Sequence, residues 1–220
     1  MRITVFGAAG AVGSRVVTEA LSRGHHVTAV VRDPARYRAP QLVPAHPGAA
    51  LTVGAGDASD LTDALRLSTG QDLVITATRP ALGREDDLVT TTKTLLAAAR
   101  ASATRLLVVG GAATLTVPGS GGATVLDDPA HLPAAYRPIA LACAAQLETC
   151  RTDTDTDWAY LSPAAQLLPG VRTGGYRLGA DELLLDADGI SAISMEDLAV
   201  ALLDEAEHPR HRRTRFTAAY

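Results

Sequence analysis

Short apolar runs alternate with helix-patterned segments along the first half of the chain. The runs predict strands, because each has the length of a strand buried on both faces of a parallel sheet. They are RITVF at 2–6, HVTAVV at 26–31, LTVG from 51, DLVITAT from 72 and RLLVVGG from 105. Between them, apolar residues at helical spacing predict helices at 11–23, 60–67 and 85–102, while the proline-rich segment 33–47 predicts a loop. Parallel strands need crossover connections that pack as helices on both faces, so the pattern predicts a doubly wound parallel α/β sheet.

The regular alternation ends after Gly110. Residues 114–133 are rich in glycine, proline and aspartate, which predicts an excursion above the sheet. The sequence then predicts a helix at 134–151, a strand at 157–163, a hairpin at 174–185, a strand at 189–194, a helix at 195–207 and a strand at 214–220. We expect one domain over residues 1–220, in which residues 112–133 and 163–190 form a small substrate-side lobe.

The composition is that of an ordinary globular protein. Apolar residues make up 47% of the 220 residues, and no apolar run approaches the length of a membrane span. The net charge of −4 argues against a nucleic-acid-binding face. Cys143 and Cys150, the only cysteines, lie too far apart in a predicted helix to pair, and no signal-peptide pattern precedes the first strand. We therefore expect a cytoplasmic protein without nucleic-acid or membrane partners, as a monomer or homodimer.

Three glycines separate the first predicted strand from the first predicted helix. Gly7, Gly10 and Gly13 form a GxxGxxG motif, the spacing of short-chain dehydrogenases. The first glycine permits a tight turn, the second lets a pyrophosphate approach the backbone, and the third lets the helix pack close to the sheet. Free amides at the helix N-terminus then face the anion. The motif predicts a dinucleotide site formed by Gly7, Ala8, Ala9, Gly10, Ala11, Val12 and Gly13.

The residues after the second strand bear on which dinucleotide binds. An acid at this point binds the ribose hydroxyls of NAD, whereas an arginine accommodates the 2'-phosphate of NADP. Arg32 follows the strand directly, Arg36 lies within reach, and Asp33 stands between them. Because a guanidinium suits a phosphate, we expect NADP to be favoured over NAD, whose binding would use Asp33. Asp57, past the third strand, is expected either at the adenine rim or as a turn residue.

Two later strand ends complete the expected cleft, because ligands of such sheets lie beyond the carboxyl ends of the strands. Ala77, Thr78 and Arg79, with Pro80, follow the fourth strand and should pass under the phosphates and ribose. Gly110 and Gly111 end the fifth strand, where the sheet opens toward the nicotinamide.

The catalytic pair of short-chain dehydrogenases is missing. Those enzymes use a tyrosine followed four residues later by a lysine, but no tyrosine here has that partner, and Lys93 is the only lysine. The catalytic residues are therefore unknown, and acid-base catalysis at a carbonyl is unsupported. Hydride transfer to a flavin such as FMN or FAD asks less of the protein, because solvent can protonate the product. His208 and His211 have no evident third ligand, so no metal site is expected.

The chain resembles a known family over nearly its whole length. GAAGAVGSRVVTEALSRGHHVTAVVRDPAR is similar to the start of atypical short-chain dehydrogenases of the NmrA-like group, and within it to bacterial NADH-flavin reductases, distant relatives of flavin/biliverdin reductase. The likeness continues through LLVVGGAATL, WAYLSPAAQLLPGVRTGGYRLGADELL and SAISMEDLAVALLDEAEHPRHRRTRF. It implies an NAD(P)-binding Rossmann fold with a small C-terminal substrate region.

The resemblance also implies site residues. Besides the positions already named, Ala112, Ser162, Pro163 and Ala164 would line the cofactor cleft. The serine that flavin/biliverdin reductase has near Gly111, and its histidine near Ala164 or Ala165, are both absent here. This departure puts biliverdin-type activity in doubt.

Three functions remain open from the sequence. The leading hypothesis is an NAD(P)H-dependent reductase of a flavin, quinone or similar planar small-molecule acceptor, with cleft walls at 115–132 and 163–176. The second is a non-catalytic, NmrA-like redox sensor that binds NADP. The third is an epimerase, dehydratase or tailoring enzyme with a tightly held cofactor.

Overall fold

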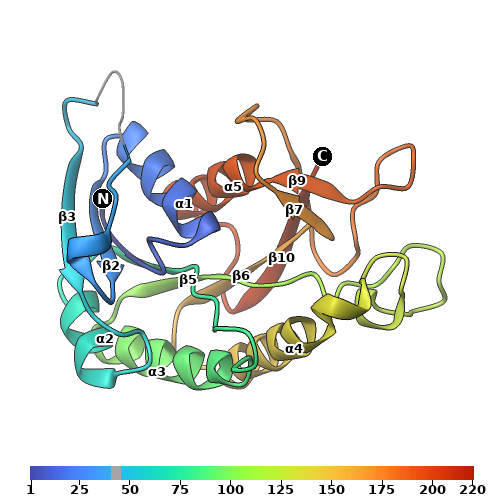
Figure 1. Cartoon of the computed structure of the whole chain (residues 1–220), viewed down its shortest axis with the longest axis horizontal. Coiled ribbons are helices and arrows are strands. Elements are labelled where there is room, and N and C mark those ends of the chain that lie inside the picture. Colours follow the sequence, from blue (N-terminus) through green and yellow to red (C-terminus); the bar gives the residue numbers. More distant parts are fainter. Residues whose placement is uncertain (41–45) are drawn as a thin grey trace.

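A mostly parallel sheet of eight strands runs through the molecule, in the order β3-β2-β1-β4-β5-β6-β10-β8 (Figure 1). The structure is a computed structural model that describes residues 1–40 and 46–220. Its strands are β1 Arg2–Phe6, β2 His26–Val31, β3 Ala50–Ala55, β4 Leu73–Thr76, β5 Arg105–Val109, β6 Trp158–Pro163, β10 Thr214–Ala219 and the edge strand β8 Arg177–Gly179. All neighbours are parallel except β8, which pairs antiparallel with β10. The predicted doubly wound fold is therefore confirmed.

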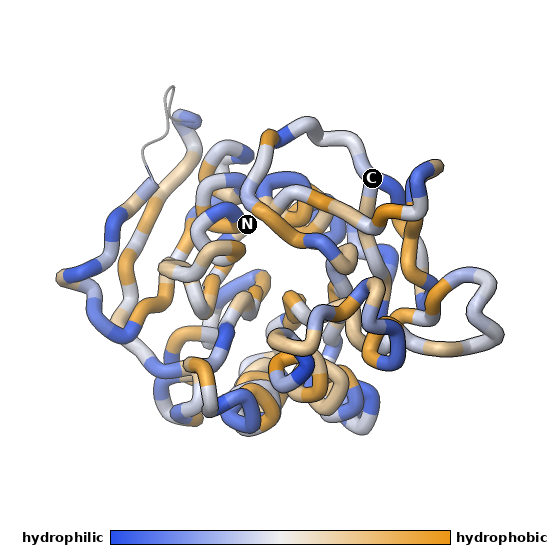
Figure 2. Tube along the Cα trace, turned by 45° about the vertical axis from the view of Figure 1, so that its right-hand side comes forward, coloured by the Kyte–Doolittle hydropathy of each residue, from blue (hydrophilic) through white to orange (hydrophobic). Residues whose placement is uncertain are grey.

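Helices cover both faces of the sheet. The helices α1 (Ala11–Ser22) and α5 (Met195–Glu207) lie on one face, and α2 (Leu61–Ser68), α3 (Asp87–Ala101) and α4 (Arg137–Thr152) lie on the other (Figure 1). On the first face Val16 and Leu198 pack over Val5, and on the second Leu95 packs over Val74. The hydrophobic positions of the strands and of the inner helix faces gather between these layers (Figure 2). Burial of these apolar faces stabilises the layered arrangement.

The crossover from β3 to β4 creates the switch point of the sheet. Strands β2 and β3 follow one another on one side of β1, and β4 lies on the other side of β1. The loops after β1 and β4 consequently diverge and leave a crevice at the carboxyl ends of these two strands.

Four regions differ from the sequence expectations. The predicted hairpin at 174–185 is wrong: β8 pairs with β10, whereas Leu183 N–H donates to the Thr116 carbonyl at 2.8 Å. Each half of that segment finds a distant partner, which no local pattern reveals. The strand predicted at 189–194 is shortened to β9 (Ala192–Ser194), and it pairs in parallel with β7 (Gln166–Leu168), which the sequence did not predict.

The other two differences are local. The helix predicted from residue 134 starts with a 3-10 turn at Ala134–Tyr136, and α4 begins only at Arg137. Pro138 explains this, because it lacks the N–H that would bond to the carbonyl of residue 134 in a continuous α-helix. The predicted loop 33–47 contains a 3-10 turn at Pro34–Arg36, and its residues 41–45 lie outside the described residues.

Candidate functional site

A deep cleft of about 1470 Å³ opens at the carboxyl ends of β1, β4, β5 and β6. It extends from Arg32 and Asp57 at one end, past the glycine turn after β1, to residues 163–168 and the start of α4 at the other. The switch point of the sheet therefore coincides with the cleft, as the fold leads one to expect.

The turn after β1 requires glycine for reasons that the structure makes explicit. Gly7 has a φ of +80°, and a Cβ there would lie 2.5 Å from the Ala77 carbonyl oxygen of the neighbouring loop. A Cβ on Gly13 would lie 2.1 Å from the Gly7 carbonyl oxygen. The close approach predicted for the first and third glycines is thus present, and it draws α1 tightly against the end of β1.

The N-terminus of α1 presents free donors to the cleft. Its cap residue is Gly10, which has no side chain to accept from the first-turn amides, and Gly10, Ala11 and Val12 all line the cleft. These amides and the positive end of the helix form an anion site that matches the pyrophosphate of a dinucleotide. The residues present therefore fit a nicotinamide dinucleotide.

The end of the cleft near β2 contains an arginine and an aspartate. Arg32 lines the cleft, whereas the Asp33 carboxylate caps the adjoining 3-10 turn by accepting from Ala35 N–H at 3.1 Å. Asp57 also lines the cleft, and it accepts from Ser59 N–H at 2.9 Å and from the Ser59 hydroxyl at 2.7 Å. These two hydrogen bonds, together with the charge of Arg32, lower the pKa of Asp57. Asp57 therefore has the expected role of a turn residue, and its contact with the adenine rim stays a prediction.

The floor of the cleft after β5 is closed by Tyr160 and Cys143. A Cβ on Gly110 would lie 1.9 Å from the Tyr160 ring, and one on Gly111 would lie 2.8 Å from the Cys143 Cβ. The buried Tyr160 hydroxyl accepts from Gly111 N–H at 3.2 Å and lies 3.0 Å from the Cys143 carbonyl oxygen, to which it donates. No serine fits at position 111 without moving α4, so the missing catalytic serine has a packing cause.

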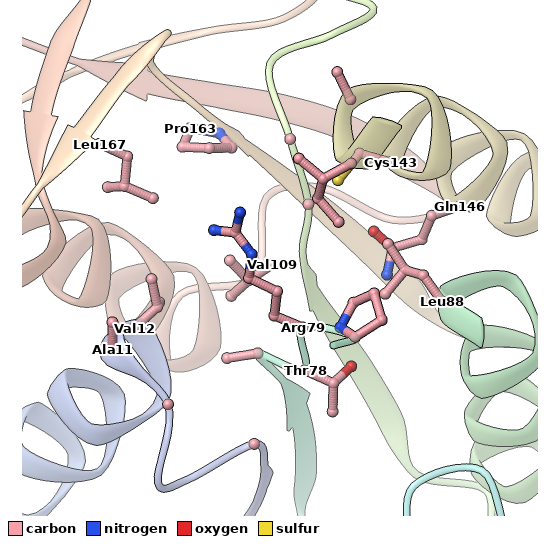
Figure 3. Close-up of a pocket in the computed structure, with 18 of the residues that line it drawn as sticks. Ala11, Val12, Thr78, Arg79, Leu88, Val109, Cys143, Gln146, Pro163 and Leu167 are labelled. Atoms are coloured by element: carbon pink, nitrogen blue, oxygen red, sulfur yellow. The ribbon is translucent and has the colours of Figure 1, made fainter. Parts of the chain in front are cut away.

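The central part of the cleft is mostly apolar, with one cation (Figure 3). Arg79 extends from the loop after β4 into the space between Val109, Pro163 and Leu167. Burial raises the pKa of the Cys143 thiol to about 11, against the opposing influence of the Arg79 charge. Cys143 is therefore a neutral thiol in the cleft wall rather than a nucleophile.

Most of the predicted site residues come together in the cleft. Its lining includes Gly7, Ala9, Gly10, Ala11, Val12, Arg32, Asp57, Ala77, Thr78, Arg79, Gly110, Gly111, Ala112, Pro163 and Ala164. The structure places Ala8 and Ser162 in the interior and Gly13 inside the helix turn, away from the lining. Ser162 lies on β6 opposite Thr217 of β10, so its side chain is covered by the neighbouring layer.

One expected wall of the cleft and several unexpected residues differ from the sequence analysis. Residues 163–168 line the cleft, but residues 169–176 pack against α1 and α5 instead. The sequence analysis missed Ile139, Cys143 and Gln146, although their spacing places them on one face of α4. Of the wall expected at 115–132, Val125, Ala130, His131 and Leu132 line the cleft, although the sequence analysis gave His131 no role of its own.

The histidines near the C-terminus form a structural cluster. His211 Nδ1 lies 2.8 Å from Glu205 Oε2, and the His211 ring stacks on Phe216. In the described part of the chain, no three potential ligand side chains gather as a metal site would require. Within residues 1–40 and 46–220, no helix combines the length and hydropathy needed to cross a bilayer.

The chain is similar to known proteins along its full length. The profile of the NAD(P)H-binding family matches residues 7–209. A Burkholderia pseudomallei structure named "putative exported protein" is 37% identical, with a TM-score of 0.85 and 100% of both chains covered. A "putative epimerase" of Bacteroides thetaiotaomicron is 36% identical, with a TM-score of 0.86, covering 100% of this chain and 96% of that one. A "putative NADH-flavin reductase" of Streptococcus pneumoniae is 30% identical, with a TM-score of 0.86 and coverage of 100% and 99%. These three names agree on no single activity.

Proposed function

The chain belongs to the NAD(P)H-binding family, and from that premise we propose that it is an NADPH-dependent reductase of a flavin, quinone or similar planar acceptor. The observation that carries the proposal is one continuous cleft. It connects the N-terminus of α1, which has no side-chain cap, to a region lined mostly by apolar side chains. The wall of the cleft beside Gly111 leaves little room for a side chain, because a Cβ there would lie 2.8 Å from the Cys143 Cβ. An apolar cleft of this kind can hold a planar acceptor against the nicotinamide. Hydride transfer to such an acceptor does not require a tyrosine-lysine pair.

Different residues along the cleft would bind the dinucleotide and the acceptor. The amides at the start of α1 hold the pyrophosphate, and the walls at Val109, Pro163 and Leu167 exclude water around the acceptor. When bound, the reduced nicotinamide supplies the two electrons and the hydrogen that the acceptor gains. In this proposal the substrate side comes from the parts of residues 112–133 and 163–190 that line the cleft. The likeness to an NmrA-like reductase implied a small C-terminal substrate region.

The preference for NADPH rests on Arg32. Arg32 lines the cleft, while Asp33, the acid that would bind the ribose of NAD, is occupied as the cap of a 3-10 turn. A guanidinium at this place suits a 2'-phosphate, with which it forms charge-assisted hydrogen bonds.

A charge reversal tests the assignment of the 2'-phosphate. We expect Arg32→Glu to weaken NADPH binding by about 10- to 100-fold and to change NADH binding little, because only NADPH loses charge-assisted hydrogen bonds. Fluorescence titration of both dinucleotides measures this difference. Arg36→Glu is the matched control, because Arg36 has the same charge nearby but does not line the cleft. Equal losses for both dinucleotides in Arg32→Glu would contradict the assignment.

Turnover tests the reaction itself. Purified protein with NADPH and either FMN or menadione should oxidise the dinucleotide, measured by absorbance at the nicotinamide band. Binding without oxidation above background would contradict the proposal in favour of a redox sensor. Dinucleotide that stays bound through purification, without net consumption during turnover, would instead support an epimerase-like reaction. A cytoplasmic location and a monomer or homodimer remain predictions that these assays do not address.

A further inference from the structure

Three side chains with a transferable proton line the substrate side of the cleft. Among the described residues that line the cleft beyond Gly111, these are His131, Tyr136 and Cys143. Tyr160, which lies beneath them, is fully buried and hydrogen-bonded to Cys143 and Gln146. Any proton that the protein gives to an acceptor therefore comes from one of these three groups.

Two of the three groups are poorly suited to donate. Burial raises the pKa of Cys143 to about 11, so the thiol holds its proton through the neutral range. Tyr136 is 55% exposed, and Ala140 occupies the position four residues on, where a lysine would assist release of the phenol proton. The imidazole of His131, in contrast, has two ring nitrogens for hydrogen bonding to an acceptor, and His131 lines the cleft.

His131 lies on a hydrogen-bonded turn at the edge of the cleft. The Asp128 carbonyl accepts from His131 N–H at 3.1 Å and from Leu132 N–H at 3.0 Å, and the Asp128 carboxylate accepts from Ala130 N–H at 2.8 Å. Leu132 packs against the buried cluster of Leu115, Val117, Val125 and Leu183, which anchors the turn. Backbone hydrogen bonds and an apolar anchor thus fix the position from which the imidazole enters the cleft lining.

The ring nitrogens of His131 are available to hydrogen-bond a ligand. Its Nε2 lies 4.0 Å from Asp128 Oδ2, beyond a direct hydrogen bond, and its side chain is 18% exposed. The ring forms no hydrogen bond with any residue that the structure describes. The Asp128 carboxylate is the charged group beside the ring, and Arg79 lines the same cleft.

We propose that His131 donates the proton that a conjugated carbonyl acceptor, such as a quinone, takes up on its oxygen during reduction. This inference rests on the proposed function and narrows its substrate class. The hydride from the reduced nicotinamide would form a C–H bond at a ring carbon conjugated with the carbonyl. The C=C π pair then forms a new C=C bond to the carbonyl carbon, and the C=O π pair moves to the oxygen. The oxygen takes a proton from the His131 ring, which regains one from solvent. A reduced flavin delocalises its negative charge over the ring system. Its reduction therefore depends less on a proton from the protein than the reduction of a quinone does.

The test compares His131→Gln with Tyr136→Phe, a matched control that removes the alternative donor in the same wall. With NADPH and menadione, His131→Gln should lower kcat about 100-fold. With FMN the same variant should lose much less of its kcat, because reduction of the flavin depends less on this proton. Tyr136→Phe should lower the menadione kcat much less than His131→Gln does.

A binding measurement without any dinucleotide gives an independent readout. The probe is 4-nitrophenolate, an aromatic oxyanion that mimics the reduced acceptor. At pH 8.5, where most of the probe is ionised, His131→Gln should weaken its binding about tenfold, and Tyr136→Phe should not. Normal menadione kinetics and normal 4-nitrophenolate binding in His131→Gln would overturn the inference while leaving the reductase proposal intact. Absence of NADPH oxidation by the wild-type protein with either acceptor would overturn both.

Discussion

Single glycines decide whether the cofactor site can form. Gly7 combines a left-handed φ of +80° with a neighbouring carbonyl oxygen that a Cβ would approach to 2.5 Å. Gly83 has the same φ of +80°, but a Cβ there would have nothing within 4 Å. The two positions therefore separate the cost of backbone conformation from the cost of a steric clash.

We expect Gly83→Ala to cost about 1 kcal/mol of unfolding free energy, the conformational penalty alone. Gly7→Ala should cost at least about 3 kcal/mol and weaken dinucleotide binding, because the turn after β1 must move away from the Ala77 carbonyl. Urea denaturation and fluorescence titration measure the two effects. Similar unfolding free energies for the two variants would show that the loop after β4 yields without cost.

At the substrate end of the cleft, side chains at Gly110 and Gly111 would also clash with their neighbours. Tyr160 and Cys143 fill the space that side chains at these positions would occupy. Close packing of α4 against the end of β5 therefore leaves little room for side chains at these two positions. The proton donor that we propose, His131, lies on the excursion at 114–133 instead.

At the scale of elements, residues 169–176 form a strap that fastens the substrate side to α1 and α5. Glu19 of α1 accepts from Arg172 Nε at 2.7 Å, and Glu196 of α5 accepts from Gly170 N–H at 2.7 Å. Asp197 accepts from Thr173 N–H at 2.9 Å and from Gly174 N–H at 2.8 Å. The strap therefore ties the wall at 163–168 to the same helix whose N-terminus forms the anion site.

Asp197 gives the strap a pH dependence. Burial would raise the pKa of its carboxyl, but hydrogen bonds from Thr173, Gly174 and Tyr220 outweigh burial and hold that pKa below the ordinary value. A pKa that is lower in the folded state means that the carboxylate stabilises the fold above pH 4 or so, and that this contribution is lost as the pH falls further. Glu19, whose pKa Arg172 and Arg23 lower against burial, acts in the same direction.

We expect Asp197→Asn to lower the unfolding free energy at pH 7 by about 1–3 kcal/mol, because an amide replaces a carboxylate that accepts several hydrogen bonds. The variant should also lose less stability than wild type between pH 5 and pH 3. Urea denaturation across this range measures both effects, with the exposed Asp188→Asn as control. Parallel pH profiles for Asp197→Asn and wild type would rule out this role of the carboxylate.

At the scale of the whole molecule, the cleft joins both halves of the sheet. Its lining draws on β1 and β2 at one end and on β5 and β6 at the other. A ligand that spans the cleft contacts segments distant in sequence, and it binds only when the entire sheet is assembled. Dinucleotide binding should therefore stabilise the whole fold rather than one region.

NADPH at 100 times its Kd should stabilise the protein by about 2.7 kcal/mol, which raises the Tm by roughly 5–10 °C for a chain of this size. Thermal unfolding followed by circular dichroism measures this shift. Arg32→Glu should show a smaller shift with NADPH at the same concentration and an unchanged shift with NADH. No shift with either dinucleotide would refute the assignment of the cleft as their site.

The sequence by itself determined the elements and the class of cofactor. Strands β1 and β2 and helix α5 have the predicted bounds, and the glycine motif lies between β1 and α1 as expected. These features are local: apolar periodicity and the conformational freedom of glycine act over a few residues, so a single stretch of chain reveals them.

Only the tertiary structure decided the substrate side. The partners of β8 and of Leu183, the anchoring of the strap by Asp197, the contact of Cys143 with Gly111, and the entry of His131 into the cleft all join segments far apart in the chain. Such contacts depend on which surfaces meet once the sheet has closed. The pattern within any one segment is therefore compatible with several partners, and packing of the whole molecule selects among them.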